Sequence, residues 1–268
     1  MMGGMKEAAP VGDFDAHKPN IARVYDFLLG GKDNFEADRE MARQLLEGYP
    51  ATAQLAKEGR AFLGRAVLWA AEHGIGQFLD LGAGLPTREN THQIARSVNP
   101  DARVCYVDND AMAVMHANAL LARPDGIAAT QADLADTDAV LADRYVQQVI
   151  DLSEPVCVIM AAVLHFYSAD TARRIAQAYI GHVPSGSALV ISCVHSENAE
   201  SWAKSRKNYR ASAVYNHSRA ELLSFFDGLD MVPPGIAPAH AWRGGMADAP
   251  SAPAGRYAYA LAGVGVKP

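Results

Sequence analysis

Short apolar runs alternate with helical patterns through the middle of the chain, and this alternation constrains the fold more than any other feature. The runs at 77–81, 103–107, 127–131, 156–163 and 187–194 are typical of buried strands, and a helical segment follows each of the first four. A repeated strand–helix order predicts a parallel sheet with right-handed crossovers. Because the strands are apolar almost throughout, helices should cover both faces of the sheet. The expected fold class is therefore α/β, with a doubly wound sheet.

The last third of the chain departs from this pattern. Ser218 and Glu221 form a capping box that opens a helix, which should end near Gly228. Two strands are predicted after it, at 231–237 and 256–266, with a loop and no helix between them. Since strands joined without a crossover helix pair as antiparallel neighbours, we expect a hairpin at the edge of the sheet.

Helical patterns fill the chain before the first strand. Asn20 suits the N-cap of a first helix, a second helix follows Asn34, and a third covers about 52–73. A nucleotide-binding fold begins with its first strand, so these helices are an addition, and such additions often cover the ligand. The expected division of the chain is a flexible tail at 1–18, a helical cap at 19–75 and the sheet domain at 76–268.

Composition argues against several classes of partner. The chain has 24 Lys and Arg residues against 30 Asp and Glu, a formal net charge of −6, whereas nucleic-acid binding needs a clustered excess of positive charge. We find no signal peptide, no apolar run of membrane-spanning length and no carboxylate cluster with metal-ligand spacing. The three cysteines lie in apolar runs, which indicates reduced thiols in a core. We expect a cytoplasmic protein with no metal, nucleic-acid or membrane partner, and we leave a homodimer open.

A glycine-containing turn after the first predicted strand is the main candidate for ligand binding. It reads Asp80-Leu-Gly-Ala-Gly-Leu-Pro-Thr87, in which small residues let the backbone approach a ligand. The second predicted strand ends at Asp108, where a carboxylate can accept hydrogen bonds from ribose hydroxyls. The alternative is that Asp108 and Asp110 only cap the next helix.

Two cofactor classes compete for this turn, a dinucleotide and a nucleoside with a short charged tail. A dinucleotide fold needs a third glycine where this chain has Thr87. Pro86 removes an amide donor that a diphosphate would use, and Asp80 would repel phosphate but attract an amine. These residues favour a ligand with ribose, adenine and a cationic amino-acid tail, which describes S-adenosylmethionine.

Several segments of the chain carry a family resemblance. They are 19–34 (PNIARVYDFLLGGKDN), 80–87, 90–92, 107–108 and 242–243. On these segments the chain resembles the class I methyltransferases. More narrowly, it is similar to an actinobacterial S-adenosyl methyltransferase family formerly described as a domain of unknown function. The resemblance covers nearly everything after residue 18. It implies a Rossmann-like sheet of seven strands in the order 3-2-1-4-5-7-6, with strand 7 antiparallel. Pro86 replaces the third glycine of the class motif, which puts the usual path of the methionine tail in doubt.

The resemblance also implies roles for individual residues. Asp80 would lie near the cofactor's amino group, Asp108 would hold the ribose, and Asn109 would border the adenine. Asp133 would accept a hydrogen bond from the adenine amino group, although it could also be a plain turn residue. The implied cofactor-binding set is Asp80, Gly82, Ala83, Gly84, Thr87, Asp108, Asn109, Asp133, Leu134, Ala161, Ala162 and, from the N-terminal motif, Asn34.

The acceptor side is less defined by the sequence. His165 follows the fourth strand and could act as a general base, because its unperturbed pKa lies near neutrality, although a lone histidine is often structural. Tyr25 is the second candidate catalytic residue, with core packing as its alternative. We expect methyl transfer to a small molecule such as a secondary metabolite. The competing hypotheses are a non-catalytic, regulatory S-adenosylmethionine-binding protein and, less favoured, a nicotinamide-dependent oxidoreductase.

Overall fold

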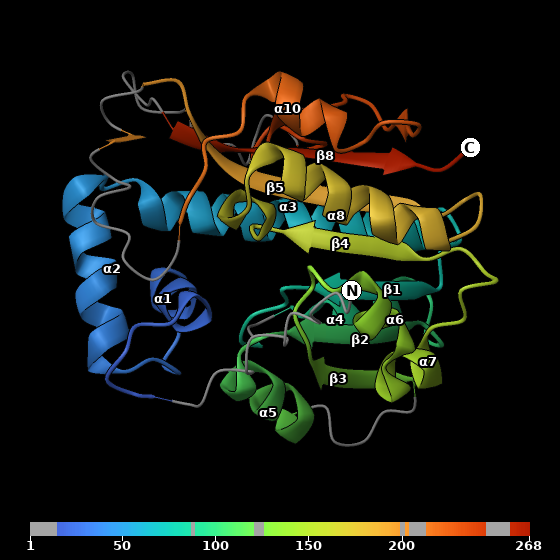
Figure 1. Cartoon of the computed structure of the whole chain (residues 1–268), viewed down its shortest axis with the longest axis horizontal. Coiled ribbons are helices and arrows are strands. Elements are labelled where there is room, and N and C mark those ends of the chain that lie inside the picture. The colour runs from blue at the N-terminus through green and yellow to red at the C-terminus, as the bar shows by residue number, and fades with distance from the viewer. Residues whose placement is uncertain (1–14, 87–88, 121–125, 199–201, 204–212, 245–257) are drawn as a thin grey trace, which may run out of the picture.

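A mixed sheet forms the centre of the computed structural model, which describes residues 15–86, 89–120, 126–198, 202–203, 213–244 and 258–268 (Figure 1). Its strands lie in the order β3-β2-β1-β4-β5-β8-β6, and β7 also pairs with β8. The strands are β1 (Gln77–Leu81), β2 (Arg103–Asp108), β3 (Ile127–Gln131), β4 (Cys157–Ala161), β5 (Ala188–Ser196), β6 (Asp230–Met231), β7 (Ala237–Pro238) and β8 (Ala258–Val266).

The pairing confirms the expected topology. Neighbours among β1 to β5 are parallel, whereas β8 runs antiparallel to β5 over its whole length. The predicted terminal hairpin is present, because β6 and β7 both pair antiparallel with β8. The predicted strand over 231–237 is, however, two short strands. Gly235, with φ +78°, lies in the turn between them.

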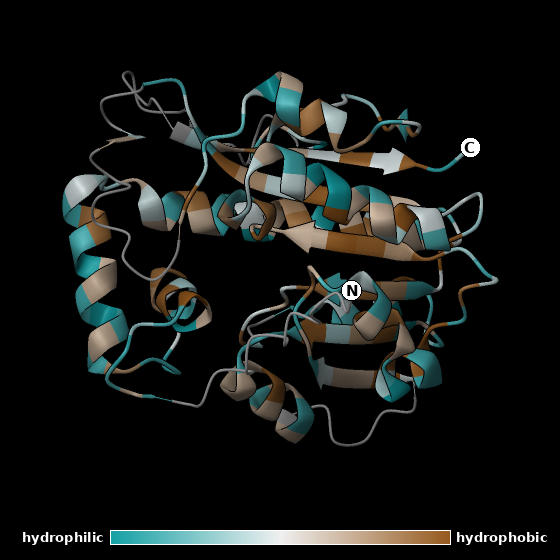
Figure 2. Ribbon diagram, in the orientation of Figure 1, coloured by the Kyte–Doolittle hydropathy of each residue, from teal (hydrophilic) through white to brown (hydrophobic). Residues whose placement is uncertain are grey.

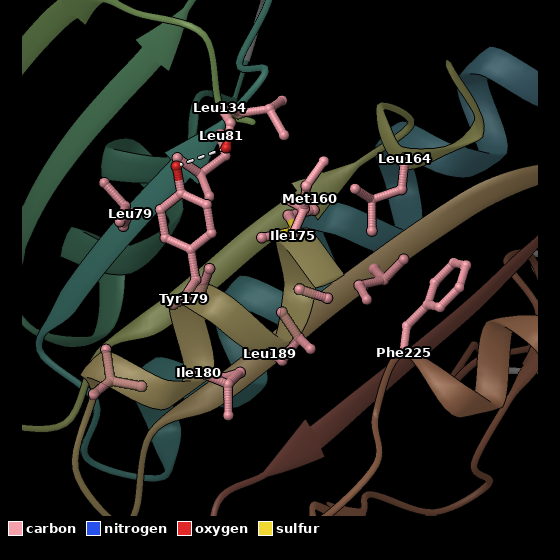
Figure 3. Packing of buried hydrophobic residues seen from close by; sticks show 14 of the residues in the cluster. Leu79, Leu81, Leu134, Met160, Leu164, Ile175, Tyr179, Ile180, Leu189 and Phe225 are labelled. Atoms are coloured by element: carbon pink, nitrogen blue, oxygen red, sulfur yellow. Dashed lines mark hydrogen bonds between the residues drawn. The ribbon is translucent and has the colours of Figure 1, made fainter. Parts of the chain in front are cut away.

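Helices cover both faces of the sheet, as the apolar strands predict. Leu79 and Leu81 of β1 point into one core layer, and Phe78, the residue before Leu79, points into the other. The first layer is completed by α6 (Thr137–Ala142), α7 (Arg144–Val149), α8 (Ala169–His182) and α10 (Arg219–Ser224), and part of it is drawn in Figure 3. The second is completed by α3 (Thr52–Glu72), α4 (Thr91–Val98) and α5 (Ala111–Leu120). In Figure 2 the strands are mostly hydrophobic, whereas α2 and α8 are mixed.

One predicted helix is two helices in the structure. The pattern over 137–150 suggests a single helix, but the chain turns at Asp143, whose ψ is 135°. The Asp143 carboxylate accepts hydrogen bonds from the backbone amides of Tyr145 and Val146, so it caps α7. It also accepts a hydrogen bond from the Thr130 hydroxyl at 2.9 Å, which fixes this cap to β3. Side-chain capping and a tertiary contact therefore override the local helical pattern.

Two N-terminal helices, α1 (Ile21–Leu28) and α2 (Glu36–Gly48), lie beyond the ends of the strands (Figure 1). Val24 and Leu28 of α1 pack against Met41 and Leu45 of α2 and against Ala56, near the start of α3. Asn20 caps α1 as expected, since its side chain accepts from the amides of Ala22 and Arg23. The rest of α3 packs on the sheet, so α1 and α2 are the part of the addition that stands over the strand ends.

Candidate active site

A cavity of about 580 Å³ lies between the carboxyl ends of the strands and the first three helices. The sheet order reverses between β1 and β4, and ligands of open α/β sheets bind at such a switch point. The cavity is lined from the strand side by residues 80, 82–84, 108–109, 132–134, 161–163, 165–167, 192–194, 196, 202, 214 and 260. From the helical side it is lined by 19–22, 24–25, 28, 45, 49, 52, 55–56, 59–60 and 63.

The turn after β1 brings bare backbone to the cavity. Gly82 and Gly84 have φ values of +71° and +66°, a region that glycine adopts without steric cost. A Cβ on Gly82 would stand 2.7 Å from Cγ2 of Val163, so only glycine fits there. A Cβ on Gly84 would meet no atom within 4 Å, so the space beside this residue is open. Such an open backbone suits the close approach of a ligand.

Asp108 lies at the end of β2 and closes this turn. Its carboxylate accepts hydrogen bonds from the Gly84 amide at 2.7 Å and from the Asp110 amide at 2.9 Å. Asp110, by contrast, accepts from the amide of Ala113, so Asp110 is the residue that caps α5. Burial raises the pKa of Asp108 to about 6, and the two amides oppose this shift. Each Asp108 oxygen has a second lone pair with which to accept a ligand hydroxyl.

Asp80 lies under the same turn, at the penultimate position of β1. Its side chain is buried and accepts a hydrogen bond from the Thr91 hydroxyl at 2.6 Å. Burial raises the pKa of Asp80, while the charge of Arg60 acts in the opposite direction. A carboxylate so placed would gain from a cationic group in the cavity.

Asn109 and Asp133 mark the solvent end of the cavity, where both are exposed. The Asp133 carboxylate accepts a hydrogen bond from the Ala135 amide at 2.9 Å and another from the Tyr167 hydroxyl at 3.4 Å. The next residue, Leu134, is buried, and its carbonyl accepts a hydrogen bond from Tyr179 (Figure 3). The predicted adenine-side residues thus all line one cavity.

The chain bends sharply where β4 ends. Ala162 has φ +57°, an uncommon conformation for a residue other than glycine. Its amide donates to the carbonyl of Ser192 at 2.9 Å, which ties the bend to β5. Held in this way, Ala161 and Ala162 form part of the cavity wall beside the glycine turn.

Comparison with known proteins identifies the family. A family model described as S-adenosyl methyltransferase matches residues 7–268. The chain belongs to this family. It is an S-adenosylmethionine-dependent methyltransferase, and the open glycine turn with its two acidic neighbours fits that cofactor. No curated protein matches the chain.

Solved structures agree with this assignment. The chain is 39% identical to a methyltransferase candidate from Thermobifida fusca YX, with a TM-score of 0.86 over 94% of this chain and 96% of that one. It is 34% identical to a DUF574 family protein from Streptomyces avermitilis MA-4680, with a TM-score of 0.87 over 95% and 99% of the two chains. Magnesium protoporphyrin IX methyltransferase from Synechocystis PCC 6803, solved with bound S-adenosylhomocysteine, shares only the fold. It has 13% identity and a TM-score of 0.53 over 91% and 93% of the chains.

Both candidate catalytic residues of the methyltransferase line the cavity. His165 lies in a short 3-10 helix after β4 and is 8% exposed, and burial together with nearby His217 lowers its pKa to about 3. The Tyr25 hydroxyl donates to the carbonyl of Ala56 at 3.0 Å, and burial raises its pKa to about 12. Both side chains are therefore neutral at physiological pH.

Of the two remaining predicted cofactor residues, one is not described by the structure and the other lies away from the cavity. Thr87 lies outside the described residues. Asn34 does not line the cavity, because its amide group donates to the Asp26 carboxylate at 2.8 Å and to the Gly31 carbonyl at 3.2 Å. A side chain on Gly31 would collide with Asp26. Asp26, Gly31 and Asn34 of the N-terminal motif thus shape the turn between α1 and α2.

Arg60 is a cavity residue that the sequence reasoning missed. It projects from α3, and its guanidinium donates to the carbonyl of Glu89 at 2.8 Å, close to the glycine turn. A signal exists in the sequence, because Ala56, Arg60 and Leu63 share one face of the helix at i, i+4 and i+7 spacing. A cation on an otherwise apolar face is a candidate partner for the carboxylate of an amino-acid tail.

Neither a membrane span nor a metal site is found in the described parts of the methyltransferase. No helix there is long and apolar enough to cross a membrane. No group of three or more His, Cys, Asp or Glu side chains among the same residues is placed to hold a metal ion.

Proposed function

We propose that this methyltransferase acts on a small-molecule acceptor, such as a secondary metabolite, bound in the cavity beside the cofactor. The observation that carries the proposal is the extent of the cavity. It continues past the glycine turn into the space between β5 and helices α1 to α3. When bound, S-adenosylmethionine supplies an electrophilic methyl group, and an enclosed site supplies orientation and excludes water.

The residues at the switch point would hold the cofactor. Gly82, Ala83 and Gly84 present backbone, Asp108 accepts from the ribose, and Asn109, Asp133 and Leu134 surround the adenine. Ala161 and Ala162 form the wall on the methionine side. Asp80 faces the amino group and Arg60 the carboxylate, so the two charges of the tail each meet an opposite charge. Thr87 keeps its role as a sequence-based proposal, and Asn34 acts indirectly by shaping the α1–α2 turn.

His165 and Tyr25 are proposed to contact the reacting groups. Both belong to the cavity wall, His165 from the strand side and Tyr25 from α1. A general base is needed only if the acceptor must lose a proton early in the transfer. The ring of Tyr25 could also stabilise a cation by its π face.

The N-terminal helices are proposed to form a lid over the bound cofactor. Pro19, Asn20, Ile21 and Ala22 line the cavity, as does Leu45 of α2. We place the cap within 19–75 and the catalytic domain within 76–268, with 1–18 as a flexible tail.

Free, buried cysteines favour a cytoplasmic location. Nucleic-acid and membrane partners are not part of the proposal, and a homodimer is not required by it.

A label-transfer experiment tests the acceptor class. The purified protein is incubated with S-adenosylmethionine carrying a tritiated methyl group and with either the small-molecule or the macromolecular fraction of a bacterial extract. Label should enter small molecules only, and a Gly82→Val variant should transfer none. Transfer into protein or nucleic acid would overturn the proposal. Tight cofactor binding without transfer to either fraction would favour a regulatory binding protein instead.

A further inference from the structure

The cavity wall is chemically divided into two halves. Its charged side chains are Asp80, Asp108 and Asp133, at the ends of β1, β2 and β3, and Arg60. The Arg60 guanidinium is bonded to the Glu89 carbonyl close to the glycine turn. The other half lies towards β5 and β8, which are on the opposite side of β4. Among the residues described there, none that line the cavity are charged. Val194, Trp202 and Val214 line the cavity on this side, and Leu28, Leu45 and Leu55 line it from the N-terminal helices.

Polar groups on the helical side of the cavity and at the end of β5 are mostly engaged within the protein. The Thr52 hydroxyl donates to the carbonyl of Tyr49, and the Tyr25 hydroxyl donates to that of Ala56. The Ser196 hydroxyl donates to the carbonyl of Asn198. A charged acceptor beside Val194, Trp202 and Val214 would lose hydration without gaining an ionic partner among the described residues that line the cavity there.

His165 is the exception in this half. Its Nδ1 atom is buried and has no hydrogen-bond partner within the described part of the chain. Because His165 lines the cavity, we infer that its other ring nitrogen, Nε2, faces the cavity. A buried N–H without an acceptor is more costly than an unused lone pair, so the proton belongs on Nε2. Burial lowers the pKa of His165 to about 3, which keeps the ring neutral. His165 therefore offers the cavity a hydrogen-bond donor.

We propose that the methyl acceptor is an uncharged, predominantly apolar small molecule with an oxygen or nitrogen lone pair that accepts a hydrogen bond from Nε2 of His165. The proposal rests on the proposed small-molecule function and narrows its substrate class. It predicts that phosphorylated and carboxylated acceptors bind more weakly than uncharged ones. It also makes His165 a group that binds and orients the acceptor, in place of the general base that the sequence offered as one alternative.

Three probes of nearly equal shape test this proposal. They are 2-acetylnaphthalene, with a carbonyl lone pair, 2-isopropylnaphthalene, with none, and 2-naphthoate, with a negative charge. Each is titrated by fluorescence into the full-length protein at pH 7.5, with and without saturating S-adenosylhomocysteine. The acetyl compound should bind about tenfold more tightly than the isopropyl compound, because it forms one more buried hydrogen bond. It should bind about a hundredfold more tightly than naphthoate, because the carboxylate must be desolvated.

Variants of His165 separate hydrogen bonding from base catalysis. Gln places an amide N–H near the position of Nε2 but cannot act as a base, so H165Q should keep the preference for the acetyl compound. H165F should bind the acetyl and isopropyl compounds equally. Equal or tighter binding of naphthoate, a preference for the acetyl compound that survives in H165F, or no binding of any probe would overturn the proposal. S-adenosylhomocysteine affinity is measured alongside, because its loss would instead count against the proposed function.

Discussion

The backbone amide of Gly84 donates a 2.7 Å hydrogen bond to the carboxylate of Asp108, which joins the turn after β1 to the end of β2. This bond places the acidic group beside the open face of the glycine turn. The two features that the sequence offers for nucleoside binding therefore lie in one wall of one cavity.

We predict that Asp108→Ala weakens S-adenosylhomocysteine binding by about ten- to a hundredfold, the cost of losing a charged hydrogen-bond acceptor. Calorimetric titration measures the change. Asp101→Ala is the matched control, because Asp101 is exposed and lies outside the cavity, and it should bind like the wild type. An unchanged dissociation constant in the Asp108 variant would remove this residue from the ribose site.

The raised pKa of Asp108 predicts a pH dependence. A ribose hydroxyl donates more strongly to the ionised carboxylate, and Asp108 gains a proton as the pH falls through about 6. S-adenosylhomocysteine affinity should therefore be constant above pH 7 and about tenfold lower at pH 5. Asp80, whose pKa burial also raises, would act in the same direction. Asp108→Asn should flatten most of this dependence, and a profile identical to that of the wild type would contradict the assignment.

Arg60→Met should weaken S-adenosylhomocysteine binding by about tenfold and leave 5′-methylthioadenosine binding unchanged, because only the first ligand has the carboxylate. Lys57→Met is the control on the same helix, since Lys57 is exposed and does not line the cavity. If both ligands lose affinity equally, Arg60 supports the site without contacting the amino-acid tail.

NAD and NADP should bind no better than ordinary weak nucleotides. Asp80 and Asp108 both stand beside the turn where a diphosphate would lie, and Pro86 provides no amide donor there. Micromolar affinity for either dinucleotide, measured by calorimetry, would be incompatible with the cofactor site described above.

Hydrogen exchange tests whether the N-terminal segment is a lid. Arg23 of α1 is bonded to Asp38 of α2 at 2.8 Å and lies 3.9 Å from Asp110, which follows the ribose-side residues. Cofactor binding should thus slow the amides from about residue 25 to 38, whereas α10, which does not line the cavity, should be unaffected. Equal rates at saturating S-adenosylhomocysteine would show that the segment does not respond to the site.

Much of the fold follows from local patterns in the sequence. The alternation of apolar strands with helices predicts the parallel sheet, and the family resemblance adds the strand order. The break at Asp143 could not be predicted, because it depends on a contact with Thr130 from another element. Nor could the split of the strand over 231–237 be seen in its apolar pattern.

The site was predictable where a motif places residues at strand ends, and less so elsewhere. Gly82, Asp108 and Asp133 lie at or just after the carboxyl ends of neighbouring strands, so spacing alone brings them together. Arg60 reaches the cavity from a helix that packs across the sheet, and only tertiary structure shows which helical face turns inward. Asn34 belongs to the same motif as Tyr25, yet its side-chain amide donates a hydrogen bond to the Asp26 carboxylate and does not reach the cavity. A shared motif thus does not imply a shared site.

The structure of the protein with bound S-adenosylhomocysteine tests the central claim most directly. We expect the ribose at Asp108, the adenine between Asn109 and Asp133, and the amino-acid tail between Asp80 and Arg60, with residues 19–22 against the ligand. The half of the cavity beside His165 should stay open for the acceptor. A ligand bound away from the glycine turn, or one whose tail fills the space beside His165, would contradict this account.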